Sequence, residues 1–173
     1  MSEHTGGIVV GVDGSEASVA ALRWAVGQAR ALGTEIVVVH AWESATAGFA
    51  PYAPVSGRPT VAEQRERAAE LLAAAVHKAL GPRIRPGVRA VVAEGPPARV
   101  LLRQARGALL LALGRTAHGQ WDLPAVGTVS RECLRHAKVP VVTVPAPDVP
   151  APYRHTSSGR AVGTSSLVRS GAA

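Results

Sequence analysis

The sequence predicts an α/β protein in which helices cover both faces of a parallel sheet. Two observations predict this fold. Short runs of β-branched and other apolar residues alternate along the chain with segments whose apolar residues recur every three or four positions. The runs also lack the polar alternation of a half-exposed strand, so both faces of each strand should be buried. Alternating strands and helices then imply right-handed βαβ units in a doubly wound arrangement.

The first βα unit begins with a β-branched run over residues 8–12, which ends in the turn Asp13-Gly14-Ser15. Ser15 is a suitable N-cap for the helix that follows, and Gly33 is a suitable residue to end it. The apolar face of this helix is formed by Val19, Leu22, Val26 and Ala29.

The second unit begins with a buried strand over residues 35–41. Residues 43–59 are rich in Ala, Gly and Pro, and they form either a mobile flap or a disordered crossover. Thr60 and Glu63 then have the spacing of a capping box, which predicts the start of a second helix. Gly81-Pro82 should end that helix.

The second half of the chain continues the alternation. Residues 88–93 predict a third strand, and Gly95-Pro96-Pro97 predicts the start of a helix. The Leu-rich residues 108–113 predict a fourth and central strand, followed by a loop over residues 114–124. Thr128 is expected to cap the next helix. Residues 139–144 predict a fifth strand at a sheet edge, because Pro140 cannot donate a ladder hydrogen bond.

The length of 173 residues and the apolar content of 47% suit one globular domain. We expect this domain over residues 1–145 and a disordered tail rich in Pro, Ala, Ser, Gly and Arg over residues 146–173. No apolar run approaches the about 18 residues of a membrane span, and the polar first residues do not resemble a secretory signal. The single cysteine, Cys133, excludes an intramolecular disulfide. We therefore expect a cytoplasmic protein without a membrane partner.

The formal charge of +7 raises the question of nucleic acid binding. The chain has no run of adjacent Lys or Arg residues, and aromatic side chains, which stack on bases in single-strand binders, make up 3% of it. We favour solvated arginine side chains and do not expect a nucleic acid partner.

Candidate ligand-binding residues follow three of the predicted strands, whose carboxyl ends should share one rim of the sheet. Asp13 follows the first strand, His40 and Ala41 end the second, and Gly114 follows the fourth. Further along, Gly127 and Thr128 begin a helix, where free N–H groups can bind an anion. Each feature also has a structural explanation as a turn or a cap. Their gathering on one rim favours a phosphate site.

The chain resembles the universal stress proteins, which belong to the Rossmann-like adenine-nucleotide-binding superfamily. The resemblance rests on Ile8–Ser15, Val37–Ala41, Ala93–Ala98, a Gly-x2-Gly-x9-Gly-[Ser/Thr] loop and His136–Val142. It implies five parallel strands in the order 3-2-1-4-5, homodimers paired through strand 5, and ATP as the ligand, with Mg²⁺ arriving on its phosphates.

The resemblance also assigns roles to residues. Asp13 would contact the nucleoside, and the backbone of Gly11, Val12 and Ala41 would wall or bond the adenine. The ribose and phosphates would be held by Gly114, Arg115, Ala117, Gly127, Thr128, Val129 and Ser130. Ala117 stands where the loop motif has its second glycine.

The expected function is ATP-linked regulation of a stress response, with no catalytic residue and at most very slow ATP hydrolysis. The chain has no P-loop, its six histidines are scattered and suggest no metal centre, and His40 lacks a partner for acid–base chemistry. The alternative is a nucleotide-independent dimeric interaction module, which Ala117 favours.

Overall fold

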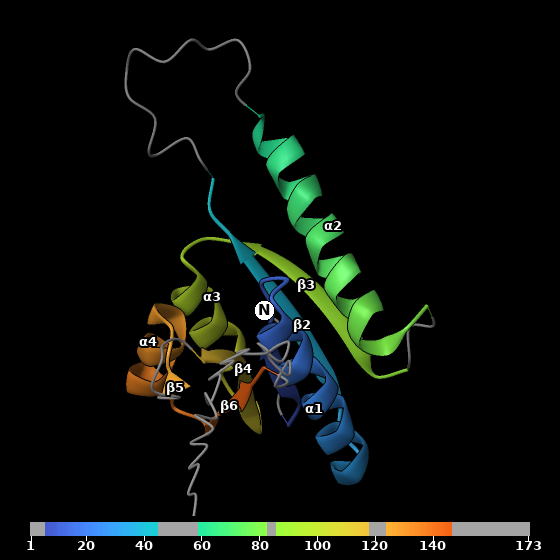
Figure 1. Cartoon of the computed structure of the whole chain (residues 1–173), viewed down its shortest axis with the longest axis vertical. Coiled ribbons are helices and arrows are strands. Elements are labelled where there is room, and N and C mark those ends of the chain that lie inside the picture. The colour runs from blue at the N-terminus through green and yellow to red at the C-terminus, as the bar shows by residue number, and fades with distance from the viewer. Residues whose placement is uncertain (1–5, 45–58, 83–85, 118–123, 147–173) are drawn as a thin grey trace, which may run out of the picture.

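The computed structural model describes residues 6–44, 59–82, 86–117 and 124–146 (Figure 1). Most of the predicted flap or crossover and the predicted tail after Ala146 lie outside these residues. The helices are α1 (Glu16–Leu32), α2 (Val61–Leu80), α3 (Pro97–Gln104) and α4 (Thr128–His136). The strands are β1 (Ile8–Gly11), β2 (Ile36–Trp42), β3 (Val88–Glu94), β4 (Leu110–Ala117), β5 (Pro124–Ala125) and β6 (Val141–Pro145).

Five parallel strands form the sheet in the order β3-β2-β1-β4-β6. This order confirms the predicted 3-2-1-4-5, since β6 is the fifth strand of the prediction. The predicted loop over residues 114–124 is wrong at both ends. The fourth strand continues to Ala117, and Pro124 begins the two-residue β5, which pairs antiparallel with Thr116 and Ala117.

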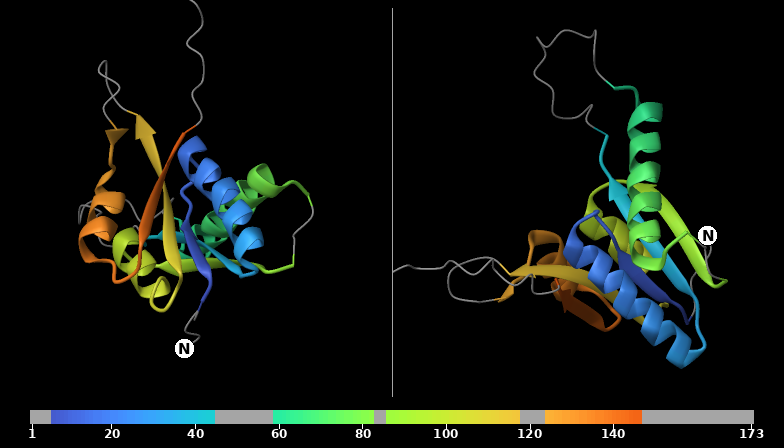
Figure 2. Two further views of the ribbon diagram at one scale, coloured as in Figure 1. Left: turned by 90° about the horizontal axis from the view of Figure 1, so that it is seen from below. Right: turned by 45° about the vertical axis from the view of Figure 1, so that its right-hand side comes forward.

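Helices cover both faces of the sheet, with α1 and α2 on one side and α3 and α4 on the other (Figure 2, left). The side chains of β1 alternate between two apolar clusters. Ile8 and Val10 pack under α1 and α2, whereas Val9 packs under α3 and α4, and all three are fully buried. The prediction of strands buried on both faces is confirmed for β1 and for the first four residues of β2, but it is wrong for the edge strands β3 and β6, which have no fully buried residue because nothing pairs with their outer edge among the described residues.

The helix ends agree with the sequence with one exception. Ser15 caps α1, Gly33 ends it in the left-handed conformation, and Thr60 and Glu63 form the predicted capping box. The prediction that Thr128 is an N-cap is wrong. Gly127 has the extended backbone of an N-cap (φ −58°, ψ 161°), and Thr128 is already the first helical residue, so its hydroxyl makes no capping bond.

The strand β6 pairs with β4 and with no other strand of the described residues, so it lies at an edge of the sheet as predicted. Pro140 precedes it, and the Pro140 carbonyl accepts a hydrogen bond of 2.9 Å from the Leu111 amide. Pairing of two chains through this edge stays a prediction. None of the helices in the part of the chain that the structure describes combines the length and hydropathy that a bilayer crossing requires.

Candidate functional site

A cavity of about 160 Å³ lies at the carboxyl ends of β1, β2 and β4. The N-terminal turns of α1 and α4 and one face of α3 close it. Its apolar and glycine lining consists of Gly11, Val12, Val39, Ala41, Pro97, Leu101, Leu113, Gly114 and Val129. Its polar lining consists of Asp13, Ser15, Ser18, His40 and Ser130. An apolar cavity with a few converging polar groups is typical of a small-molecule site.

The structure brings together most of the predicted site residues. Those that line the cavity are Gly11, Val12, Asp13, Ala41, Gly114, Val129 and Ser130. Those outside its lining are Arg115, Gly127 and Thr128. Gly127 and Thr128 are exposed and immediately precede lining residues of α4. Arg115 follows Gly114 in β4, and because side chains alternate along a strand, it shares the face of the lining residue Leu113.

Several lining residues were not assigned to the site from the sequence. They are Ser15, Ser18, Val39, Pro97, Leu101 and Leu113, while His40 was interpreted as structural. Period-two alternation through the strands could have indicated Val39 and Leu113. Pro97 and Leu101 come from α3, which reaches the cavity only through tertiary packing.

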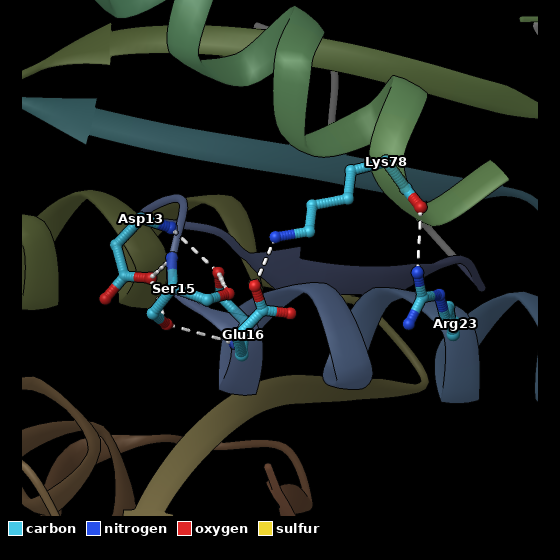
Figure 3. A network of polar contacts seen from close by, with 6 residues as sticks. Asp13, Ser15, Glu16, Arg23 and Lys78 are labelled. Atoms are coloured by element: carbon cyan, nitrogen blue, oxygen red, sulfur yellow. Dashed lines mark hydrogen bonds and ion pairs between the residues drawn. The ribbon is translucent and has the colours of Figure 1, made fainter. Parts of the chain in front are cut away.

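Asp13 is held by the first turn of α1 (Figure 3). Its Oδ1 accepts hydrogen bonds from the Ser15 amide at 3.0 Å and the Ser15 hydroxyl at 2.6 Å. Its own amide donates to Ser18 Oγ at 3.3 Å. Partial burial raises the pKa of the Asp13 carboxyl, but the hydrogen bonds from Ser15 and Ser18 outweigh this effect and hold that pKa below its ordinary value. Asp13 is therefore an oriented carboxylate at neutral pH.

Contacts between α1 and α2 fix the position of this turn. Lys78 of α2 forms an ion pair with Glu16, the first residue of α1. About two turns further along α1, the Arg23 guanidinium donates to the backbone carbonyl of the same Lys78 at 2.9 Å (Figure 3). The exposed ion pair adds little stability by itself. Together the two contacts tie the start of α1 to the end of α2.

The second strand presents two kinds of polar group to the cavity. His40 Nδ1 lies 2.8 Å from the Val12 carbonyl oxygen, so Nδ1 carries the proton and donates. This contact agrees with the structural interpretation of His40. The Val12 amide donates to the Val39 carbonyl at 2.9 Å, so both backbone polar groups of Val12 are engaged. Val12 can wall a ligand, but its backbone is not free to bond one.

Ala41 differs from Val12 in this respect. The bond from Val12 to Val39 shows that the Val39 backbone groups point toward β1. Backbone direction alternates along a strand, so the Ala41 N–H and C=O point to the same side, beyond the last residue of β1. No hydrogen bond joins either group to another described residue. Ala41 thus offers one donor and one acceptor at the rim of the cavity.

The N-terminus of α4 offers an anion-binding surface beside the cavity. The first N–H groups of a helix have no intrahelical partner, and no side chain caps them here. Ser130 lies in this first turn and is 6% exposed, and its hydroxyl has no partner within the described ranges. A buried hydroxyl without a partner is costly. Ser130 lines the cavity, so a ligand there could satisfy its hydroxyl.

The two glycines of the predicted loop have different structural roles. A Cβ on Gly114 would lie 2.5 Å from the Ser18 backbone nitrogen, so this glycine allows α1 to pack closely on β4. A Cβ on Gly127 would meet nothing within 4 Å, and its φ of −58° is open to any residue. Close packing therefore explains why residue 114 is a glycine. Residue 127 is the N-cap of α4, a position that favours glycine over alanine, but neither close packing nor a positive φ requires a glycine there.

Ala117 stands where the loop motif has a glycine, and its backbone is part of β4. It pairs with Pro124 in the antiparallel ladder, so it is extended and not left-handed. This backbone conformation does not require glycine at position 117.

Within the described residues, the cavity has neither a cluster of metal ligands nor a reactive thiol. Across residues 6–44, 59–82, 86–117 and 124–146, no group of three or more His, Cys, Asp or Glu side chains could hold a metal ion. Cys133 is fully buried in the apolar cluster under α3 and α4. Burial raises the pKa of its thiol to about 11. This cysteine is part of the core, as predicted.

The sheet order and the cavity at the carboxyl ends of its strands define a Rossmann-like α/β protein with a small-molecule site. The chain belongs to the universal stress protein family, whose family model matches residues 6–145.

Individual relatives agree with this assignment. Universal stress protein Rv2623 of Mycobacterium tuberculosis is 30% identical over 151 residues, which cover 85% of this chain and 50% of that protein. The chain thus spans about half the length of the curated relatives it matches.

Solved structures share the fold. A universal stress protein in complex with cAMP has a TM-score of 0.58 and 19% identity, over 83% of this chain and 98% of the other. The universal stress protein from Archaeoglobus fulgidus in complex with dAMP has a TM-score of 0.54 and 23% identity, over 82% of this chain and 98% of the other.

Proposed function

We propose that this protein binds an adenine nucleotide, ATP, at the cavity and acts as a nucleotide-linked regulator in a stress response. One observation carries the proposal: the uncapped N-terminus of α4 places the buried, unpartnered hydroxyl of Ser130 against the cavity. A helix N-terminus attracts phosphate through its free N–H groups and its dipole. A phosphate there would also satisfy the Ser130 hydroxyl.

The adenine would occupy the apolar part of the cavity. Its edge carries an amino donor and a ring-nitrogen acceptor side by side. The free carbonyl and amide of Ala41 form the complementary pair. Asp13 would accept from a ribose hydroxyl, because its Oδ2 is not used by Ser15.

The phosphates would lie at the mouth of the cavity, from the Ser130 hydroxyl to the exposed start of α4. Gly127 and Thr128 supply backbone N–H groups there, and the open space around Gly127 leaves room for close approach. Arg115 lies on the same face of β4 as Leu113 and would add positive charge. Mg²⁺ would arrive with the phosphates, which are its usual ligands together with water.

Relatives support the ligand class. The two solved structures described above are complexes with cAMP and dAMP, both adenine nucleotides. The proposal takes the shared adenine from them and extends it to ATP on the strength of the α4 N-terminus and Arg115.

We further propose that the bound ATP is not turned over at a useful rate. Hydrolysis requires a group that positions or deprotonates water. In this proposal Asp13 Oδ2 is engaged by the ribose, and His40, fixed through its Nδ1–H bond to the Val12 carbonyl, lies next to Ala41 on the adenine side of the site. Neither residue would stand beside the terminal phosphate, so the nucleotide would act by its presence, in a homodimer of the cytoplasm.

The second candidate function is a nucleotide-independent dimeric interaction module. The volume of the cavity favours it, because about 160 Å³ is less than the about 300–1,000 Å³ of most ligand pockets. The first proposal accounts for this volume by placing only the base and part of the ribose inside.

Calorimetric titration with ATP, AMP and adenosine in the presence of Mg²⁺ tests the proposal. Ser130→Ala should weaken ATP binding by about 10- to 100-fold, the usual range for a hydrogen bond to a charged group. Arg115→Gln should weaken ATP more than AMP, while Arg135→Gln at the far end of α4 should change neither. Ala117→Gly should leave the affinity within about threefold, because its backbone is already extended. Equal affinities of the wild type and Ser130→Ala would overturn the assignment of the phosphates to α4.

A further inference from the structure

A second concave surface lies at the opposite end of the layer formed by α3 and α4, which are side by side in both views (Figures 1 and 2). It has a volume of about 650 Å³ and is lined by one side of α3 from Arg99 onward, by the end of α4, and by the residues that follow each helix. Both helices run antiparallel to the strands, so this surface is at the amino ends of the strands. The cavity of the proposed nucleotide site is at their carboxyl ends.

Five basic side chains line this surface: Arg99, Arg103, Arg106, His136 and Lys138. We call it the basic groove. Among the described residues, no acidic side chain lines it. All five basic residues are exposed, and none has an ion pair or a side-chain hydrogen bond with another described residue. The groove therefore holds a cluster of positive charge that the described part of the fold does not neutralise.

Stabilisation of the helices does not account for this cluster. Cations in a last helical turn stabilise a helix, which explains Arg103 and His136. Arg99 is the third residue of α3 and faces the positive end of its dipole. Arg99 and Arg103 are also four residues apart, a spacing at which like charges destabilise a helix. Arg106 and Lys138 lie beyond the helix ends.

The floor of the groove is apolar. Leu102, Ala105 and Val139 line it and belong to the apolar cluster under α3 and α4 or pack against it. The volume of about 650 Å³ falls within the about 300–1,000 Å³ of small-molecule pockets. The groove thus combines an apolar body with a cationic rim.

We propose that the basic groove binds a small organic anion with clustered phosphate groups. Three guanidinium groups supply paired donors that match phosphate oxygens, and Lys138 adds a further charge. A small molecule fits better than a nucleic acid, because the groove is concave and no aromatic side chain lines it to stack on bases. The site is separate from the proposed nucleotide site and is not required by it.

The test measures the binding of inorganic tripolyphosphate, the probe, to the full chain. Calorimetry gives the affinity, and chemical-shift changes of the backbone amides in NMR spectra show where the probe binds. We expect shifts at the groove and a loss of affinity there of about tenfold or more in Arg103→Gln/Arg106→Gln. The matched control is Arg65→Gln/Arg67→Gln on α2, which removes the same charge from an exposed helix and should leave groove affinity within about twofold. The double groove variant should keep its affinity for ATP.

Three results would overturn the proposal. Tripolyphosphate shifts confined to the start of α4 would mean that the probe finds only the first site. An equal loss of tripolyphosphate affinity in the α2 control variant would mean that the net charge of the protein alone attracts the probe. Tighter binding of duplex DNA or polyglutamate, abolished by the groove variant, would assign the groove to a macromolecular anion. Failure of ATP to bind would leave the groove result intact, since the two readouts use different residues.

Discussion

Gly114 and Gly127 provide a direct test of how the rim of the sheet is built. In Gly114→Ala the new methyl group would lie 2.5 Å from the Ser18 backbone nitrogen. Backbone cannot rotate away as a side chain can, so α1 must shift on β4. Overpacking of this kind costs about 3 kcal/mol, the upper end of the usual range. For a domain of this size that lowers the Tm by about 6–12 °C.

Gly127→Ala is the matched comparison. The added methyl group meets nothing within 4 Å, and the φ of −58° suits alanine. The free energy of unfolding should fall by less than about 1 kcal/mol, because the only expected cost is that alanine is a poorer N-cap than glycine. Urea denaturation monitored by circular dichroism, with thermal scans on the same samples, measures both variants. A Gly114→Ala protein as stable as the wild type would refute the packing argument. A Gly127→Ala protein that loses as much stability as Gly114→Ala would show that Gly127 is structural.

Three further predictions concern single side chains. The pKa of Asp13 is lowered in the folded protein from 3.8, so its stabilising contribution is present above that pH and is lost as the pH falls through the folded-state pKa. The difference in free energy of unfolding between wild type and Asp13→Asn, measured by urea denaturation from pH 7 to pH 3, should therefore decrease as the pH falls. A difference that does not change with pH would contradict the lowered pKa of Asp13. The thiol of Cys133, whose pKa is raised to about 11, should resist iodoacetamide at pH 8 in native protein and react in urea, as mass spectrometry would reveal. Thr60→Ala should destabilise the protein by about 1 kcal/mol through loss of the capping box, and a denaturation midpoint equal to wild type would show that this end of α2 frays already.

The strands and most helix ends could be predicted because local chemistry determines them. The β-branched run over Ile8–Val10 is buried on both faces, and the Thr60–Glu63 spacing encodes its own cap. The end of β4 and the start of α4 could not be predicted in this way. β5 has two residues, and only its pairing with Thr116 and Ala117 makes it a strand. Gly127 and Thr128 are adjacent and both acceptable as caps, so tertiary structure decides between them.

The site residues that lie at the ends of strands could be predicted from the sequence. The lining residues that come from helices could not. Asp13, Ala41 and Gly114 could be found because carboxyl ends of parallel strands share one edge. The role of Leu101 depends on how α3 packs, which no local pattern encodes. The reason for Gly114 also became clear only from the closeness of α1. The basic groove was missed because Arg99 and Lys138 are far apart in sequence and neither belongs to a run of charge.

The central claim is that the cavity beside α4 holds an adenine nucleotide. The most direct measurement is mass spectrometry of the small molecules released when freshly purified protein is denatured by heat. The account predicts ATP in near-stoichiometric amount from the wild type and little from Asp13→Ala, with Arg135→Gln, at the far end of α4, as the reference that should retain ATP. A wild-type protein that releases no nucleotide, and that gives no calorimetric heat with millimolar Mg-ATP, would contradict the account and favour the nucleotide-independent dimer.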